Sequence, residues 1–169
     1  TLKCIRKGDL VFFYQRRIDE PQEERGFRGI FEIVSEPFTD TNDVQKDSFK
    51  VLGICYGHQL IAQQLGGKVL RSEIGEYGLV SLYIDDPQDP LFEDIPHVST
   101  AWASHTDKVE APPIGGKIIA HTDNCPIAAY NVNNRIWGVQ FHPEVSQTEY
   151  GDKMFENFAF KISKCKKIL

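Results

Sequence analysis

The stretch Val51-Leu52-Gly53-Ile54-Cys55-Tyr56-Gly57 decides what kind of fold the chain can adopt. Its first four residues are apolar without alternation, which is typical of a short strand buried on both faces. Residues 58–65 then follow as a helix candidate, and Gly66-Gly67 is a helix stop signal. A buried strand that leads directly into a helix indicates an α/β sheet.

Cys55 stands at the corner between this strand and this helix, with Gly53 and Gly57 on either side. Glycine at both positions permits a sharp turn that pushes the central side chain out of the sheet. The helix N-terminus there favours a thiolate, and its N–H groups, that of Tyr56 above all, can hydrogen-bond a developing oxyanion. The other interpretation is a small buried hydrophobe, which describes most free cysteines.

His142 and Glu144 supply a partner for this thiol. They follow a predicted strand at residues 136–141, and side chains two positions apart in an extended chain project to the same side. Glu144 can therefore orient the imidazole while His142 accepts the thiol proton of Cys55. A His-x-Glu sequence alone is typical of a surface loop, but together with the thiol corner it favours catalysis.

The rest of the chain divides into two parts, a β-rich segment at residues 1–45 and an α/β domain at residues 46–169. In the first, residues 8–14 and 29–34 are rich in aromatic and β-branched residues and predict two antiparallel strands. In the second, we expect strands at 68–70, 79–84, 118–120, 128–131 and 136–141 and a closing amphipathic helix at 151–164. The later strands lack intervening helices, so part of the sheet should be antiparallel.

Composition excludes several classes of function. The chain has 169 residues, 41% of them hydrophobic and 25% charged, which suffices for a buried core. Its net charge of −5 argues against a broad nucleic-acid-binding surface, and no run approaches the roughly 20 apolar residues of a membrane helix. The four cysteines (Cys4, Cys55, Cys125 and Cys165) form no CxxC pair, so we expect no metal site and reduced thiols in the cytoplasm.

Residues 53–59 and 138–144 together resemble the signature segments of the class I (triad) glutamine amidotransferases, and the resemblance extends from about residue 51 to the end. Within this family, residues 76–78, 104–109, 125–129 and 142–145 are most similar to the glutaminase domain or subunit of GMP synthases. The implied fold is a flavodoxin-like mixed α/β sheet with flanking helices, its N-terminal part here replaced by a β segment.

The resemblance implies hydrolysis of L-glutamine to glutamate and ammonia through a γ-glutamyl thioester on Cys55. His142 would be the base, Glu144 its orienting partner and Tyr56 the backbone donor of the oxyanion hole. The α-amino acid end of glutamine would be contacted by Gln59, Ser104, His105 and Asp107.

The resemblance also implies a partner and no cofactor in this chain. Ammonia would pass to an ATP-pyrophosphatase subunit, which uses ATP and Mg²⁺ to convert XMP to GMP. Family members normally carry an upstream Gly-Gly-Pro loop that gives the second oxyanion donor, and residues 1–50 contain no Gly-Gly. One missing donor costs roughly 10²–10³-fold in rate. Gln147 stands where the family pattern usually has histidine.

Residues 1–45 resemble part of a PUA-like (EVE-type) barrel, a family that often binds modified nucleic acid. Three alternatives to the glutaminase interpretation therefore stay open. The chain could be a catalytically impaired regulatory relative, the amidotransferase subunit of another synthase, or a nucleic-acid-binding module that acts through its N-terminal segment.

Overall fold

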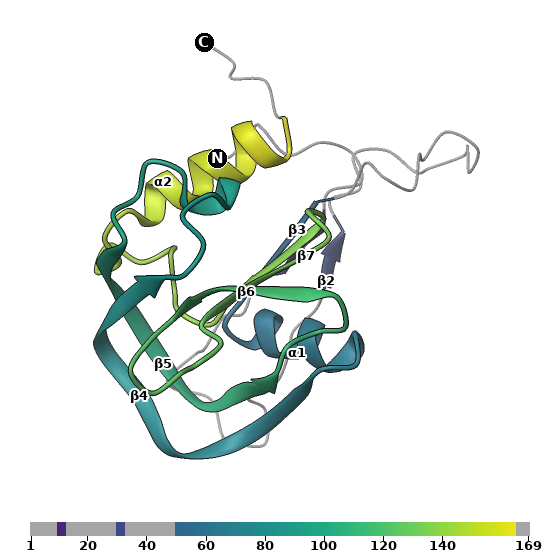
Figure 1. Cartoon of the computed structure of the whole chain (residues 1–169), viewed down its shortest axis with the longest axis vertical. Coiled ribbons are helices and arrows are strands. Elements are labelled where there is room, and N and C mark those ends of the chain that lie inside the picture. Colours follow the sequence, from purple (N-terminus) through teal and green to yellow (C-terminus); the bar gives the residue numbers. More distant parts are fainter. Residues whose placement is uncertain (1–9, 13–29, 33–49, 165–169) are drawn as a thin grey trace, which may run out of the picture.

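The computed structural model describes residues 10–12, 30–32 and 50–164 of the chain (Figure 1). These residues form a sheet in the order β2-β1-β3-β8-β7-β6-β4-β5. The strands are β1 (Leu10–Phe12), β2 (Ile30–Glu32), β3 (Val51–Ile54), β4 (Lys68–Ile84), β5 (Val98–Ala111), β6 (Gly116–His121), β7 (Ala129–Val132) and β8 (Ile136–Val139). The helical segments are α1 (Tyr56–Gln64), the 3₁₀ turn η2 (Pro90–Phe92), and α2 (Gly151–Glu156), which continues into the wider π-type turns of η3 (Asn157–Ile162).

The sheet is mixed, as the sequence predicts. β3 runs parallel to β8 and to β1, whereas β8, β7, β6, β4 and β5 are joined by antiparallel pairings. β1 and β2 are antiparallel to each other, which confirms that prediction, and they extend the same sheet beyond β3. The division at residue 45 stays a prediction, because most of residues 1–49 lie outside the described part of the chain.

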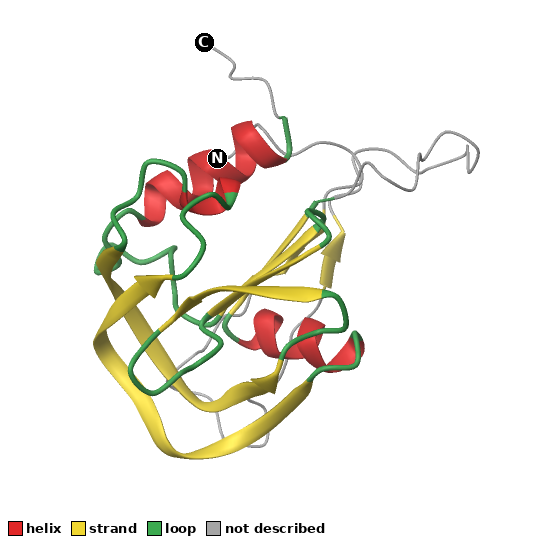
Figure 2. Cartoon of the chain, viewed as in Figure 1, coloured by secondary structure: helices red, strands yellow, loops and turns green. Residues whose placement is uncertain are grey.

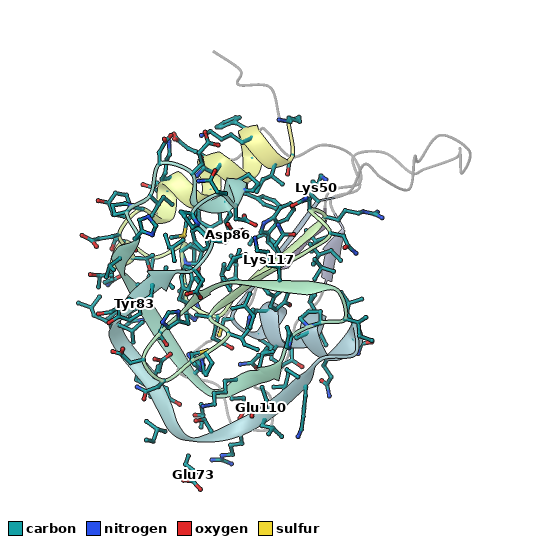
Figure 3. The ribbon with its side chains drawn as sticks, viewed as in Figure 1. Lys50, Glu73, Tyr83, Asp86, Glu110 and Lys117 are labelled. Carbon is teal, nitrogen blue, oxygen red and sulfur yellow. The ribbon has the colours of Figure 1, made fainter. Side chains whose placement is uncertain are left out.

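The strands at the far edge differ from the sequence-based expectation. Residues 68–70 and 79–84 belong to one long strand, β4, and its partner β5 was not predicted at all. β5 alternates buried and partly buried residues along most of its length, so one face of the strand is more deeply covered than the other. The two strands curl together around the lower part of the molecule, and Glu73 and Glu110 project from them into solvent (Figures 1 and 3).

Hydrophobic packing covers both faces of the sheet. On one face Trp137 packs with Met154 and Ile162 of the closing helix, which confirms the predicted helix, although it ends at residue 162. On the other face Ile61 of α1 packs against Tyr130. Figure 2 shows α1 and the closing helix on opposite sides of the central strands. Successive residues along β7 and along β8 face opposite sides of the sheet, so each of these short strands contributes side chains to both hydrophobic clusters. No helix among the described residues is long and apolar enough to cross a membrane.

Gly138 lets β8 pack closely against two buried rings. Tyr130 stacks on His58 with ring centroids 4.7 Å apart, and its hydroxyl donates to the His58 carbonyl at 2.6 Å. Burial lowers the pKa of His58 to about 3, so this imidazole is neutral and acts as a packing group. A Cβ added at residue 138 would lie 2.7 Å from Tyr130 Oη and 2.8 Å from His58 Cδ2.

Replacing Gly138 by alanine should therefore destabilise the fold. We expect Gly138→Ala to lower the free energy of unfolding by about 1–3 kcal/mol, because the two buried rings cannot move without disturbing the core. Urea denaturation followed by circular dichroism measures the change. Ser81→Ala, at an exposed position of β4, is the matched control and should stay within about 0.5 kcal/mol of the wild type. Equal midpoints for Gly138→Ala and the wild type would contradict the packing described here.

Candidate active site

Cys55 occupies a strained position between β3 and α1. Its backbone has φ 51° and ψ −105°, a conformation that costs a non-glycine residue about 1–3 kcal/mol. The Cys55 N–H donates to the Val139 carbonyl at 2.8 Å, so the turn is tied to the end of β8. A Cβ at Gly53 would lie 2.6 Å from Ile61 Cδ1 and 2.8 Å from the Gly57 backbone, which explains the glycines that flank the corner. The sharp turn predicted from the sequence is therefore present.

The structure brings His142 and Glu144 to this thiol. A hydrogen bond with the Cys55 thiol is one of the causes that raise the pKa of His142, and Nδ1 of the ring lies 2.6 Å from Glu144 Oε1. Because a carboxylate only accepts, Nδ1 carries the proton and the other ring nitrogen is left for the thiol. The backbone of His142 is held as well, since its N–H donates to the Trp102 carbonyl and its carbonyl accepts from the Thr148 hydroxyl.

These contacts favour the charged imidazole. Burial of His142 opposes the imidazolium, but the hydrogen bonds and the negative charges of Cys55 and Glu144 outweigh it and raise the pKa of His142 to about 10. The side chain of Glu144 is half exposed and that of His142 is largely covered. Cys55 and His142 can therefore share a proton as a thiolate–imidazolium pair, which is the form that a cysteine nucleophile needs.

Gln140 is a further neighbour of the thiol that the sequence did not single out. It follows β8 directly and is fully buried, and its Nε2 donates to Cys55 Sγ at 3.8 Å. Its Oε1 accepts from Gln59 Nε2 at 2.9 Å, and the same nitrogen of Gln59 donates to the Asp107 carbonyl at 2.7 Å. The register of β8 against β3 was the signal that could have placed Gln140 beside Cys55.

The remaining predicted site residues lie around the same corner in different ways. Tyr56 is the first residue of α1, directly after the thiol. The Ser104 carbonyl lies 4.0 Å from Cys55 Sγ. His105 points into the interior toward Glu76, whereas Asp107 has an exposed side chain and turns its carbonyl inward. Direct contact of these residues with glutamine stays a prediction.

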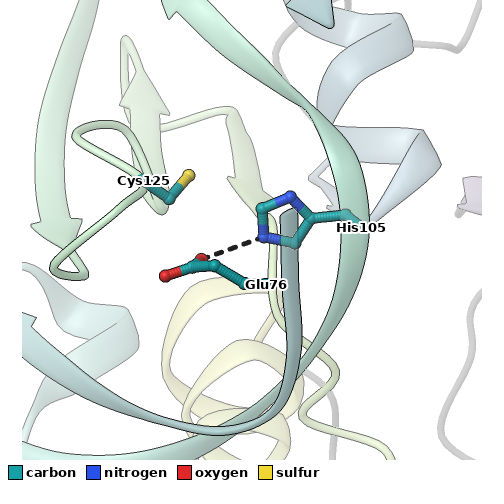
Figure 4. Close-up of side chains that lie close together, drawn as sticks. All are labelled: Glu76, His105 and Cys125. Carbon is teal, nitrogen blue, oxygen red and sulfur yellow. Dashed lines mark hydrogen bonds and ion pairs between the residues drawn. The ribbon is translucent and has the colours of Figure 1, made fainter. Parts of the chain in front are cut away.

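One cluster among the described residues has metal-ligand chemistry: Glu76, His105 and Cys125, whose ligand atoms lie within 4.8 Å of one another (Figure 4). All three are buried, but each polar group already has a partner in the chain. The His105 nitrogens face Glu76 and a backbone carbonyl, and Thr122 donates to the other oxygen of Glu76. Burial and the charge of Glu76 raise the pKa of the Cys125 thiol to about 12. The donor set therefore fits an internal ion pair beside a protonated thiol better than a metal centre.

The contact between Cys55 and His142 predicts a measurable titration. We expect His142 of the wild type to titrate near pH 10, well above its ordinary value of 6.5, and Cys55→Ala to lower this pKa because it removes the largest favourable contribution. Glu144→Gln should lower it too. A pKa raised on folding adds stability that is complete below about 6.5 and is lost as the pH rises through about 10.

Histidine side-chain NMR across this pH range measures the effect. His121, which forms a half-exposed pair with Asp85 and lies outside the site, is an internal control whose NMR signals should coincide in the three proteins under matched conditions. A wild-type His142 that titrates at 6.5, or one that Cys55→Ala does not move, would show that the thiol and the imidazole are not paired.

Comparison with known proteins agrees with this geometry. The family model of "Glutamine amidotransferase class-I" matches residues 36–162, and the model of the "EVE domain" matches residues 1–52, which confirms both resemblances. The GMP synthase [glutamine-hydrolyzing] of Clostridium novyi is 52% identical over 128 residues, 73% of this chain and 25% of that protein. A GMP synthase [glutamine-hydrolyzing] subunit from Methanocaldococcus jannaschii is 50% identical over 109 residues, 64% of this chain and 57% of that subunit.

Solved structures give the same result. A putative GMP synthase subunit from Thermoplasma acidophilum superposes with a TM-score of 0.66 at 29% identity and covers 70% of this chain and 60% of that one. A glutamine amidotransferase from Thermotoga maritima superposes with a TM-score of 0.52 at 25% identity over 68% of this chain. The chain spans about a quarter of the Clostridium protein and just over half of the Methanocaldococcus protein. The chain belongs to the class-I glutamine amidotransferases.

Proposed function

We propose that this chain is a glutaminase that hydrolyses L-glutamine to glutamate and ammonia. The observation that carries the proposal is the Cys55 thiol, held at a strained strand–helix corner against an imidazole that Glu144 orients. The names of its relatives, glutamine-hydrolysing GMP synthases, support the choice of substrate.

The reaction follows from these three side chains. The Cys55 thiolate attacks the side-chain amide carbon of glutamine, and a C–S bond forms as the carbonyl oxygen becomes an oxyanion beside the Tyr56 N–H. The His142 imidazolium gives its proton to the departing nitrogen, so ammonia leaves and a γ-glutamyl thioester remains. His142 then takes a proton from water, which attacks the thioester and releases glutamate. Glutamine and water give glutamate and ammonia, with no net change in the protein.

Substrate orientation is assigned to the neighbouring polar groups. Gln59 donates within the protein to Gln140 and to the Asp107 carbonyl, so we propose that it shapes the site around the α-amino acid end of glutamine. The exposed Asp107 carboxylate suits the α-ammonium group, and the carbonyl of Ser104 lies beside the thiol. Fixing both ends of the substrate places its amide carbon within reach of the sulfur.

We further propose that the ammonia is delivered to an ATP-pyrophosphatase partner for the amination of XMP, in the cytoplasm. This assignment rests on the relatives, which include a GMP synthase and one of the subunits of another GMP synthase. ATP and Mg²⁺ would belong to the partner, and this chain would need no cofactor of its own, since attack, proton transfer and leaving-group protonation are all assigned to side chains described here.

A second candidate is a regulatory relative that has kept the fold and still binds a synthetase partner but no longer hydrolyses glutamine. The observation in its favour is that residues 1–50 contain no Gly-Gly sequence, so the loop that gives family members their second oxyanion donor has no counterpart within these fifty residues. With one donor, the rate should be roughly 10²–10³-fold lower than with two. Slow glutamate release that depends on Cys55 would therefore agree with the proposed glutaminase function.

The test is glutamate release from glutamine, with and without an ATP-pyrophosphatase partner supplied with ATP, Mg²⁺ and XMP. We expect the wild type to release glutamate and Cys55→Ala to fall to background, because the substitution removes the nucleophile that forms the thioester. Cys165→Ala is the thiol control and should retain the wild-type rate. Equal release by wild type and Cys55→Ala would exclude the nucleophile. The regulatory relative would be favoured if wild type and Cys55→Ala both release glutamate only at the background rate, while a reactive glutamine analogue still labels Cys55 selectively.

A further inference from the structure

Glu76 and His105 form a buried pair behind the candidate active site. His105 Nε2 lies 3.1 Å from Glu76 Oε2, and the two side chains are only 3% and 5% exposed, Glu76 the less so (Figure 4). The residues are also direct partners across β4 and β5, at the point where regular pairing resumes after the irregularity between Arg71 and Glu76. The pair therefore holds the two long strands in register beside the thiol.

Both ring nitrogens of His105 face acceptors. Nδ1 lies 3.0 Å from the Asp107 carbonyl and Nε2 lies 3.1 Å from a carboxylate oxygen of Glu76, so the ring is held from both sides. Burial opposes the charge on Glu76, but hydrogen bonds from His105 and Thr122 outweigh it and hold the pKa of Glu76 below its ordinary value. Removal of either partner would leave a buried polar group of the other without its hydrogen-bond partner.

Two routes connect this pair to the nucleophile. The Asp107 carbonyl accepts from His105 Nδ1 and also from Gln59 Nε2, and Gln59 in turn donates to Gln140, whose amide reaches Cys55 Sγ. The second route is the backbone, because residue 104 directly precedes His105 and turns its carbonyl toward the same sulfur at 4.0 Å.

We propose that Glu76 and His105 are positioning residues for Cys55, which act through the Asp107 carbonyl and the amides of Gln59 and Gln140. The pair fixes segment 104–107, and this segment sets the polar groups around the sulfur so that the thiol stays against the His142 imidazole. The kinetic part of this inference rests on the proposed glutaminase function, whereas the effect on thiol reactivity does not.

This role differs from direct contact of His105 with the substrate. Both nitrogens of His105 are engaged inside the protein, so an interaction with glutamine would require the ion pair to break. A substrate-contacting His105 would change KM when replaced, with little effect from Glu76. A positioning pair instead changes kcat, and either replacement has the same consequence.

The experiment measures two quantities in Glu76→Ala, His105→Ala and the double variant. The first is the rate of Cys55 alkylation by iodoacetamide without glutamine, with the modified cysteine located by mass spectrometry. The second is kcat and KM for glutamine. We expect each single variant to lose about tenfold in alkylation rate and in kcat, as a small misplacement of a reacting group does. The double variant should be no worse than either single variant, because both break one unit.

Three controls separate positioning from a general loss of structure. Glu76→Gln keeps the size of the side chain and one acceptor oxygen, so it should fold and lose only about threefold. Ile119→Val removes one methyl group from the buried hydrophobic cluster that contains Trp137 and should leave alkylation unchanged. His121→Ala breaks the half-exposed His121–Asp85 pair and should also leave it unchanged.

The outcomes are distinguishable. The inference would be overturned if His105→Ala and Glu76→Gln are alkylated at the wild-type rate, because the pair would then have no effect on the thiol. Faster alkylation would overturn it too, because the pair would then only limit access of the reagent to Cys55. A rise in KM alone in His105→Ala would assign it to substrate contact instead. If the wild type has no glutaminase activity, the proposed function fails, and the alkylation series still decides whether the pair positions the thiol.

Discussion

The parallel pairing of β3 with β8 is the constraint on which the site depends. The register sets Gly53 beside Gly138 and Ile54 beside Val139, and the Cys55 N–H extends the ladder by one bond to the Val139 carbonyl. The thiol and the segment that carries His142 therefore leave the sheet at the same edge. Parallel strands end together on one side, so their carboxyl ends gather side chains from distant parts of the chain. A shift of one residue would turn every side chain of β8 to the opposite face.

Hydrogen-bonded pairs with little exposure to solvent give the chemistry to the sheet edge that carries Cys55. The two negative partners of His142 outweigh the cost of its burial and keep its proton available for a leaving group. Behind it, Glu76 and His105 form a second buried pair, which shares the Asp107 carbonyl with Gln59. Both pairs cost desolvation energy, and each is stabilised only by a closely placed opposite charge.

Sequence patterns predicted the strongly local parts of this structure. β3, the corner at Cys55, α1 and the closing helix each depend on glycine placement or apolar spacing within a few residues, and each is present within a few residues of the expected bounds. Long-range pairing explains the failures. β5 reads as a polar stretch in the sequence, and it is a strand because β4 supplies hydrogen bonds along its length and buries alternate side chains.

The sequence by itself determined the family, the nucleophile candidate and its His–Glu partner, because two short motifs carry these and their residue types restrict the chemistry. Only the tertiary structure decided how the neighbours of the thiol are used. It placed Gln140 against the sulfur, directed the His105 ring inward to Glu76 and left the Asp107 carboxylate outside. The physical reason is that the fate of a polar side chain depends on the acceptors and donors that distant strands bring to it, and no local pattern of residues contains that information.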